Sequence, residues 1–257
     1  MIIPTAKPEK IYGGITTAIK VFKEILPKGA LVRVVITSDD IDFDSVEFLS
    51  KTFDIDFLVN AKTNTDTAKN EIVDLNKFRD GLGVSSNDVF FSTAWWTANV
   101  AFRAYDFLNQ FSAKPAKIIY LIQDYEPGFY QWSNHSALAR STYERPNETI
   151  AIINSEELGK HVLERHDYKN ALVVPYRVNA NINKYLIQNG LEDRVKKKII
   201  LVYGRPSVKR NLFEVIVEGL TIWQQNNPDN AKDYEIIFVG EAFDKNLVSQ
   251  LINAEVK

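Results

Sequence analysis

The sequence predicts an α/β protein with a mainly parallel sheet, and two features predict it. Short apolar runs rich in β-branched residues alternate along the chain with segments whose apolar residues recur at helical spacing. A strand followed by a helix, repeated several times, is typical of a parallel sheet covered by helices on both faces. With 257 residues, the chain has room for between one and two such domains.

The predicted strands of the first part of the chain, residues 1–175, are short apolar runs. Val, Ile and Thr dominate in Leu31–Thr37, and Lys117–Ile122 is the strongest run. The full set of strands expected here is Met1–Ile3, Leu31–Thr37, Asp88–Ser92, Lys117–Ile122, Thr149–Ile153 and Leu172–Val174. Because ligands of such sheets bind beyond the carboxyl ends of the strands, the residues that follow each strand are the candidates for function.

The predicted helices of the same part follow the strands. In the first of them Ile15, Ile19, Phe22 and Leu26 share one face. The helices expected are Ile15–Leu26, Asp44–Phe53, Ala94–Asn109 and Ser155–Arg165. Asn154 and Glu157 have the spacing of a capping box at the start of the last one.

A second, smaller unit is expected over residues 196–257, after a polar, Asn-rich interdomain link at 176–195. It reads as strand, helix, strand, helix, at Ile199–Tyr203, Leu212–Gln224, Glu235–Val239 and Lys245–Ala254. Two parallel strands leave unpaired edges and uncovered apolar faces. This unit should therefore dock on the first, pair with another chain or be the front half of a longer domain.

Composition and charge exclude several classes of protein. Lys and Arg number 31 against 33 Asp and Glu, so the chain lacks the basic surplus that nucleic-acid binding usually needs. The absence of cysteine excludes disulfides, cysteine nucleophiles and cysteine-based metal sites. No apolar run is long enough for a membrane span, and no signal-peptide layout is present. We expect a cytoplasmic protein without a dedicated metal site.

The first candidate motif is a glycine pair, Gly13 and Gly14, which comes after the first strand and at the start of the first helix. Glycine lets backbone N–H groups approach an anion closely, and a helix N-terminus favours negative charge. The alternative is a flexible turn that caps the helix. The spacing matches neither a dinucleotide-binding fingerprint nor a P-loop.

The second candidate motif is basic and follows the strand at Ile199–Tyr203. No acidic residue lies between Arg194 and Arg210. Arg205, Lys209 and Arg210 would converge near a helix start, where a diphosphate would be bound by the forked guanidinium groups and the ammonium. The alternative is a solvated basic loop. Asn211 and Glu214 have capping-box spacing for the next helix.

The third candidate motif, residues 123–132, directly follows the strongest strand and combines carboxylates with aromatic rings. Aromatic faces and carboxylate acceptors suit a sugar, and a carboxylate here could act as a general base. The alternative is an aromatic loop that packs over the sheet edge. The residues concerned are Asp124, Tyr125, Glu126, Phe129, Tyr130 and Trp132, with His135 within reach, whereas His161 and His166 are expected to have surface roles.

The segments around Gly13, Asp124 and Arg205 resemble the rhamnosyltransferase family typified by WsaF. The resemblance runs from about residue 1 to the end, and the 122–133 segment is its most specific part. These enzymes are two-lobed glycosyltransferases of the GT-B fold, grouped near family 4. The resemblance implies a Rossmann-like first lobe, which binds the acceptor, and a partial Rossmann-like second lobe, which binds the donor.

The same resemblance implies an activity. A sugar, rhamnose, would pass from a nucleotide-diphosphate donor such as dTDP-rhamnose to a polysaccharide acceptor, with no metal or other cofactor. The protein would be cytoplasmic or peripheral to the inner face of the membrane.

The resemblance also implies roles for individual residues. Gly13 and Gly14 would border the donor diphosphate, and Arg205 and Lys209 would bind it, with Arg210 in the same cluster. Asp124, Tyr125 and Glu126 would lie at the acceptor side of the cleft. Together with the reasoning from the residues, this makes Asp124 and Glu126 the expected catalytic carboxylates. The expected acceptor and sugar contacts are Tyr125, Phe129, Tyr130, Trp132 and His135.

A second lobe of this fold normally holds more strands and helices than residues 196–257 supply. The expectation is therefore a truncated enzyme, or a half that needs a partner and forms an oligomer through its incomplete lobe. Two alternatives belong to other classes. One is a non-catalytic module that binds a nucleotide sugar or carbohydrate, and the other is an assembly subunit whose exposed sheet edge pairs with another chain.

Overall fold

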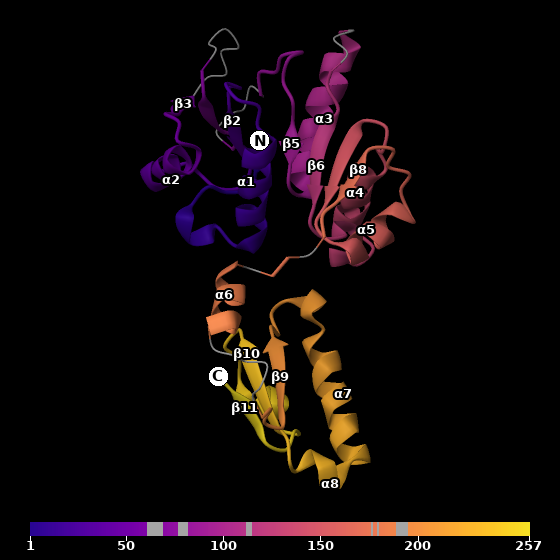
Figure 1. Cartoon of the computed structure of the whole chain (residues 1–257). Helices are drawn as coiled ribbons and strands as arrows, with labels where there is room; N and C mark the ends of the chain where they lie inside the picture. Colours follow the sequence, from indigo (N-terminus) through magenta and orange to yellow (C-terminus); the bar gives the residue numbers. More distant parts are fainter. Residues whose placement is uncertain (61–68, 77–81, 112–114, 176, 179, 189–194) are drawn as a thin grey trace. The chain divides into compact units, whose positions relative to one another are not determined.

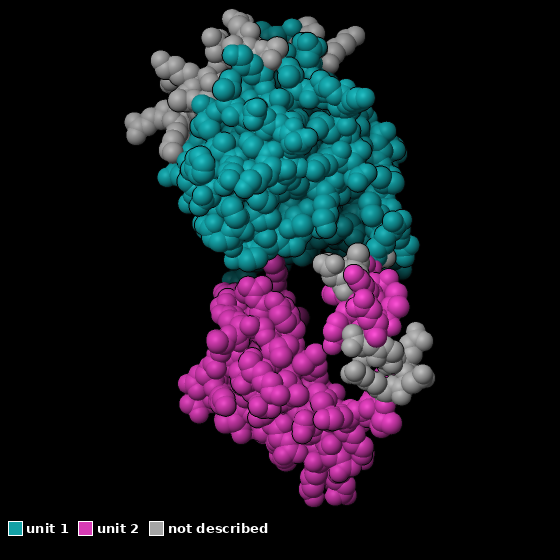
Figure 2. All heavy atoms as spheres, turned by 60° about the vertical axis from the view of Figure 1, so that its left-hand side comes forward, with its two compact units in different colours: residues 1–177 teal, residues 178–257 magenta. Residues whose placement is uncertain are grey.

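The computed structural model describes residues 1–60, 69–76, 82–111, 115–175, 177–178, 180–188 and 195–257 (Figure 1). The chain divides into two compact units, Met1–Arg177 and Val178–Lys257, coloured teal and magenta in Figure 2. Within the described ranges, none of the helices combines the length and the apolar run that crossing a bilayer requires.

The first unit is built around an eight-stranded sheet in the described part of the chain, and all neighbouring strands in it are parallel. The order is β3-β4-β2-β1-β5-β6-β7-β8. The strands are β1 (Ile2–Ile3), β2 (Arg33–Ile36), β3 (Leu58–Asn60), β4 (Glu71–Asp74), β5 (Phe91–Ser92), β6 (Ile118–Ile122), β7 (Thr149–Ile153) and β8 (Ala171–Val173). The predicted α/β class with a parallel, Rossmann-like sheet is confirmed.

Helices cover both faces of this sheet (Figure 1). Successive residues of β1 point to opposite faces, so Ile3 packs with Phe22 of α1 on one face and Ile2 packs with Phe102 of α3 on the other. Helices α1 and α2 contribute to the first of these cores, and α3, α4 and α5 contribute to the second. Their bounds are α1 (Gly13–Ile25), α2 (Phe43–Phe53), α3 (Trp95–Gln110), α4 (Asn134–Tyr143) and α5 (Glu156–Leu163), with 3₁₀ turns η1 (Pro8–Lys10) and η2 (Glu126–Phe129).

Strand β4 is one of several elements that the sequence does not predict, together with β3 and α4. It has four residues and an acidic residue at each end, which is unusual for a fully buried strand. Glu71 is nevertheless only 1% exposed. Its carboxylate pairs with Arg33 of the neighbouring strand β2, with Nε and Oε2 3.3 Å apart. The acidic residue is thus accommodated by a partner far away in sequence.

The predicted capping box at the start of α5 is wrong. Ser155 is the N-cap, and its Oγ accepts a hydrogen bond from the Leu158 N–H at 3.2 Å. Asn154 instead extends the pairing of β7, because its N–H donates to the Ile122 carbonyl of β6.

Strand β1 lies at the point where the strand order reverses. The chain proceeds from β1 to β2 on one side and later returns to β5 on the other side. The loops that follow β1, β5 and β6 therefore meet at the carboxyl edge of the sheet, next to the reversal point. This is where ligands of doubly wound sheets bind.

The second unit contains a three-stranded parallel sheet in the order β11-β10-β9. Phe213 and Val217 of α7 pack on Ile236 and Phe238 of β10, whereas Leu201 of β9 is exposed on the opposite face. The elements are α6 (Ala180–Gln188), β9 (Ile199–Gly204), η4 (Lys209–Asn211), α7 (Phe213–Asn226), α8 (Pro228–Ala231), β10 (Glu235–Gly240), η5 (Lys245–Val248) and β11 (Ala254–Val256). A partial Rossmann-like second unit is confirmed. Residues 176, 179 and 189–194 of the predicted link lie outside the described residues, and α6 occupies part of the rest.

The helix predicted at Lys245–Ala254 is wrong. The segment forms the single turn η5 and then strand β11. Asn253 adopts the left-handed conformation with a φ of 57°, which a continuing helix does not allow. Its Nδ2 donates to the Lys232 carbonyl at 3.0 Å, and its own carbonyl accepts from Ile236 of β10. These bonds turn the chain into the sheet.

The stability of the second unit is predicted to depend on Gly240, at the end of β10. Its φ is 127°, and a Cβ there would lie 2.7 Å from the Gly204 carbonyl oxygen. Gly240→Ala should destabilise the unit by about 2 kcal/mol, measured by hydrogen exchange of the β9 and β10 amides. Gly219→Ala is the matched control, because a Cβ on this exposed helical residue meets nothing within 4 Å. The control should stabilise the unit by about 0.5–1 kcal/mol. Equal effects of the two substitutions would contradict this reading.

Candidate functional site

Three loops at the carboxyl edge of the first sheet carry most of the predicted residues of this unit. Gly13 and Gly14 follow β1, Trp95 follows β5, and Gln123 and Asp124 follow β6. The start of α1 lies against the end of β6, since a Cβ on Gly14 would be 3.6 Å from the Gln123 side-chain amide. Gln123 is thus a site residue that the sequence did not single out.

The glycine pair forms the first two residues of α1 rather than a turn before it. The N-cap residue, Tyr12, has an extended backbone and provides no side-chain hydrogen bond to the helix start. The first N–H groups of a helix have no partner within the helix. The start of α1 therefore has N–H donors and a positive helix end, and the binding of an anion there stays a prediction.

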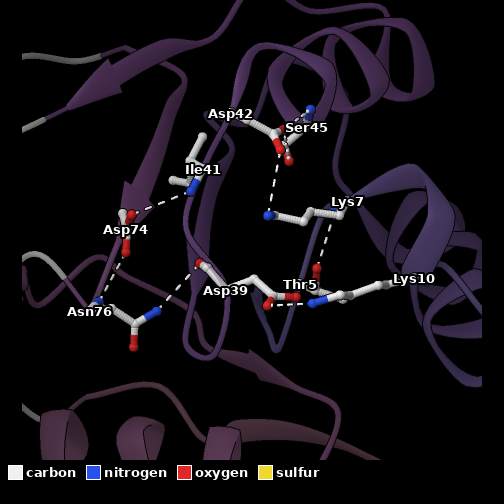
Figure 3. Close-up of polar contacts among 9 residues, drawn as sticks. All are labelled: Thr5, Lys7, Lys10, Asp39, Ile41, Asp42, Ser45, Asp74 and Asn76. Carbon is white, nitrogen blue, oxygen red and sulfur yellow. Dashed lines mark hydrogen bonds and ion pairs between the residues drawn. The ribbon is translucent and has the colours of Figure 1, made fainter.

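Polar contacts hold the loop that precedes the glycine pair (Figure 3). Lys10 Nζ lies 2.7 Å from Asp39 Oδ1, and Lys7 Nζ lies 3.7 Å from Asp42 Oδ2. The hydrogen bond to Asp39 raises the pKa of Lys10, and the same bond lowers the pKa of Asp39. The Asp39 carbonyl also accepts a hydrogen bond from Asn76 Nδ2 at 3.3 Å, beyond the end of β4. The loop after β1 is thus tied to the loops after β2 and β4.

Glu126 is the central residue of the site in the first unit. Its Oε2 accepts hydrogen bonds from the Trp95 backbone N–H at 2.6 Å and from the Tyr120 hydroxyl at 3.1 Å. Trp95 is the first residue of α3, so the carboxylate sits at the positive end of that helix. Burial nevertheless outweighs these bonds and raises the pKa of Glu126 to about 7.

The main chain beside Glu126 is held by Tyr143 of α4. The Tyr143 hydroxyl donates to the Asp124 carbonyl at 2.9 Å and accepts from the Glu126 N–H at 3.3 Å. Asp124 itself is exposed, and its Oδ1 accepts the N–H of Tyr125 at 2.8 Å. The two predicted catalytic carboxylates thus differ in environment, since one is largely buried and the other faces solvent.

Three rings gather beside Glu126. Trp95 Nε1 donates to the Tyr130 hydroxyl at 3.0 Å, and the ring of His135 lies 5.4 Å from that of Tyr130 and 6.2 Å from that of Trp95. His135 comes from the first turn of α4. The sequence predicts Tyr130 and His135 as site residues, whereas it places Trp95 only within the helix expected at Ala94–Asn109. Phe129 neighbours this group with its ring 6.4 Å from that of Tyr130, and Trp132 is exposed.

Tyr125 lies apart from these three rings and packs against α5. Its hydroxyl is 3.3 Å from His166 Nε2, and its ring is 4.8 Å from that of His161. Both histidines are partly buried, so the expected surface roles are corrected by these contacts. Burial lowers the pKa of His166. Tyr125 and the two histidines connect the loop after β6 to the loop after α5.

The predicted basic cluster lies in the second unit, in the loop between β9 and α7. Arg205 is partly buried, whereas Lys209 and Arg210 are exposed on η4. Within the described part of the chain, neither Arg205 nor Lys209 forms an ion pair with a carboxylate. The three residues lie in one loop that precedes α7, and their convergence on a diphosphate stays a prediction.

Asn211 holds this loop and does not cap α7, so the capping box expected with Glu214 is wrong. Its Oδ1 accepts the Arg205 N–H at 2.7 Å, and its Nδ2 donates to the Tyr203 carbonyl at 3.1 Å. The N-cap position belongs to Leu212, which has a φ of 56°. Asn211 thus fixes the backbone at Arg205.

Glu241 lies beside the basic loop and is not among the residues that the sequence predicts for a site. It follows β10, and its Oε2 accepts hydrogen bonds from the Ser207 hydroxyl at 2.7 Å and from the Ser207 N–H at 3.2 Å. The sequence could have indicated Glu241, because it directly follows a strand of a parallel sheet and such positions often bind ligands. The Glu241 carboxylate therefore lies against the basic loop and accepts hydrogen bonds from its hydroxyl and N–H groups.

Comparison with known families covers most of the chain. The family described as WsaF, N-terminal domain, matches residues 1–156, and the one described as WsaF, C-terminal domain, matches residues 198–257. No curated protein matches the chain.

Glu126 should make stability depend on pH. The unfolded chain releases this proton near pH 4.5, whereas the folded chain keeps it until about pH 7. Between these values the folded state binds more protons, so stability falls as pH rises. Glu126→Gln, which retains an acceptor for Trp95, should remove this fall and be more stable by up to about 3 kcal/mol above pH 7.

The measurement is urea unfolding at a series of pH values from 4 to 8. Glu24→Gln, which alters an exposed carboxylate on α1, is the control and should keep the wild-type slope. If the free energy of unfolding of Glu126→Gln changed with pH as that of the wild type does, the Glu126 carboxyl group would ionise as it does in water.

Proposed function

The chain belongs to the WsaF family, and from this premise we propose that it transfers rhamnose from dTDP-rhamnose to a polysaccharide acceptor. Membership of the family indicates a glycosyltransferase-like protein. The choice of rhamnose and of a polysaccharide rests on the resemblance of the segments around Gly13, Asp124 and Arg205. The GT-B arrangement of the two units remains a prediction.

The observation that carries the proposal is the environment of Glu126. A general base works best when its pKa is near the working pH, and burial brings the pKa of Glu126 to about 7. The Trp95 N–H and the Tyr120 hydroxyl both donate to Oε2. We assign to Oε1 the acceptance of the proton from the acceptor hydroxyl.

The rings beside Glu126 support a carbohydrate at this edge. A pyranose presents apolar C–H faces and many hydroxyl groups, which suit aromatic faces and carboxylate oxygens. In the proposal Trp95, Tyr130 and His135 bind the sugar at the reacting position, and Phe129 supports them. The exposed carboxylate of Asp124 accepts its hydroxyl groups. Tyr125 holds the loop through His166.

The basic loop of the second unit supports a diphosphate leaving group. Arg205, Lys209 and Arg210 would bind the donor diphosphate, whose negative charge grows as the bond to the sugar breaks. In the first unit, the uncapped N–H groups at Gly13 and Gly14 offer a second contact for phosphate.

In the proposed reaction, one bond to the sugar forms as another breaks, and Glu126 takes up the proton. The acceptor hydroxyl loses its proton to Glu126, and its oxygen forms a bond to C1 of the sugar. The bond between C1 and the diphosphate oxygen breaks, and dTDP leaves with that electron pair. Arg205 and Lys209 stabilise the charge on the leaving group.

Loss of Arg205 should weaken donor binding. Arg205→Ala removes a charged contact to the diphosphate, worth roughly 1.5–3 kcal/mol, or a 10- to 150-fold increase in the Kd for dTDP-rhamnose. Calorimetric titration with the nucleotide sugar measures it. Lys232→Ala, which changes an exposed cation before β10, is the control and should bind as the wild type does. Unchanged binding by Arg205→Ala would refute the assigned role.

Loss of the carboxylate at position 126 should slow the transfer of the sugar without weakening the binding of the donor. Glu126→Gln should lower kcat by about 10²–10⁴-fold and remove the rise of kcat with pH near 7, while donor affinity stays the same. The assay follows labelled rhamnose from dTDP-rhamnose onto an oligorhamnan, with Glu24→Gln as control. Saturable binding without product in the wild-type chain would instead identify a non-catalytic binding module.

A further inference from the structure

Trp132 stands apart from the rings of the candidate site. Its side chain is 90% exposed. In the part of the chain that the structure describes, Trp132 has no ring partner, whereas Trp95, Tyr130 and His135 contact one another. A large apolar side chain left in water on a loop of a binding edge is available to a ligand.

The indole borders an open hollow of about 520 Å³ between η2 and α4. This volume lies within the range of small-molecule sites. Gly128 of η2 and Ser136 of α4 line the same hollow. A Cβ built on Gly128 would meet no atom within 4 Å, so the space next to this residue is open.

An ion pair at the C-terminal end of α4 provides the polar part of the lining. Arg140 Nε donates to Glu144 Oε1 at 2.7 Å, and both side chains are at least half exposed. The remaining guanidinium N–H groups are donors, and the remaining carboxylate lone pairs are acceptors. Because the two charges cancel, the hollow suits a neutral ligand rich in hydroxyl groups better than a phosphate or an anionic lipid headgroup.

We propose that the hollow beside Trp132 is a second carbohydrate subsite, which holds a non-reacting sugar residue of the acceptor glycan. The indole face takes the apolar face of the sugar, and Arg140 and Glu144 take its hydroxyl groups. The loop from Asp124 to Trp132 contributes to both this subsite and the position at Glu126, so one glycan chain can occupy both. The inference rests on the proposed function for the class of ligand.

The test is binding of rhamno-oligosaccharides to the full chain, by calorimetric titration and by NMR of the Trp132 indole N–H. The wild type should bind a linear tetrasaccharide more tightly than methyl rhamnoside, and the tetrasaccharide should shift the indole signal. Trp132→Ala should weaken tetrasaccharide binding about tenfold. Phe43→Ala, which removes another exposed aromatic ring of the first unit, is the matched control and should leave it unchanged.

Gly128→Leu is a second variant, which adds a side chain to the hollow where Trp132→Ala removes one. It fills the hollow without removing a ring, and it should weaken tetrasaccharide binding as Trp132→Ala does. Full tetrasaccharide affinity in both variants would overturn the subsite. A Trp132 signal that responds to anionic phospholipid vesicles and not to the oligosaccharide would also overturn it, in favour of a membrane contact.

Failure of the subsite and failure of the proposed function give different results. Rhamnosyl transfer by the wild type, together with Trp132-independent binding, overturns the subsite alone. Binding that depends on Trp132, without any transfer from dTDP-rhamnose, supports the subsite and overturns the proposed catalysis.

Discussion

The hydrogen bond from the Trp95 N–H to the Glu126 carboxylate holds together the candidate site of the first unit. It joins the loop after β6 to the start of the helix after β5. A carboxylate at a helix N-terminus is favourable, and it supplies one of the partners that the helix start lacks. The same position removes the carboxylate from water, which raises the pKa of Glu126. The contact therefore fixes where the carboxylate lies, and burial at that place raises its pKa although the hydrogen bond itself lowers it.

The other functional loops are held in a comparable way, by side chains that bind the main chain or each other. Lys10 and Asp39 fix the loop before the glycine pair, and Tyr143 fixes the main chain on both sides of Tyr125. In the second unit, Asn211 fixes the backbone at Arg205. The groups assigned to binding thus stand on loops whose own polar groups are already engaged, which is what pre-organisation of a site requires.

Much of the fold could be predicted from local pattern, because long apolar runs such as Ile118–Ile122 and Thr149–Ile153 form buried strands. Strand β4 could not, since its acidic residue Glu71 is buried beside Arg33 of another strand, with which it forms an ion pair. The error at Lys245–Ala254 has a similar cause, because bonds from Asn253 to distant backbone groups override local helical spacing. The candidate loops were located because they follow strands. The environment of Glu126 depends on Trp95, 31 residues away in sequence, and no local pattern reveals that.

The titration of Glu126 tests the central claim most directly. Carboxyl ¹³C NMR of the full chain with labelled glutamate, assigned with the Glu126→Gln variant, follows this group alone. A midpoint close to pH 7 is the result that the hydrogen-bonded, desolvated position requires. A midpoint near 4.5 would show that the carboxylate is hydrated, and it would remove the physical basis for Glu126 as the base.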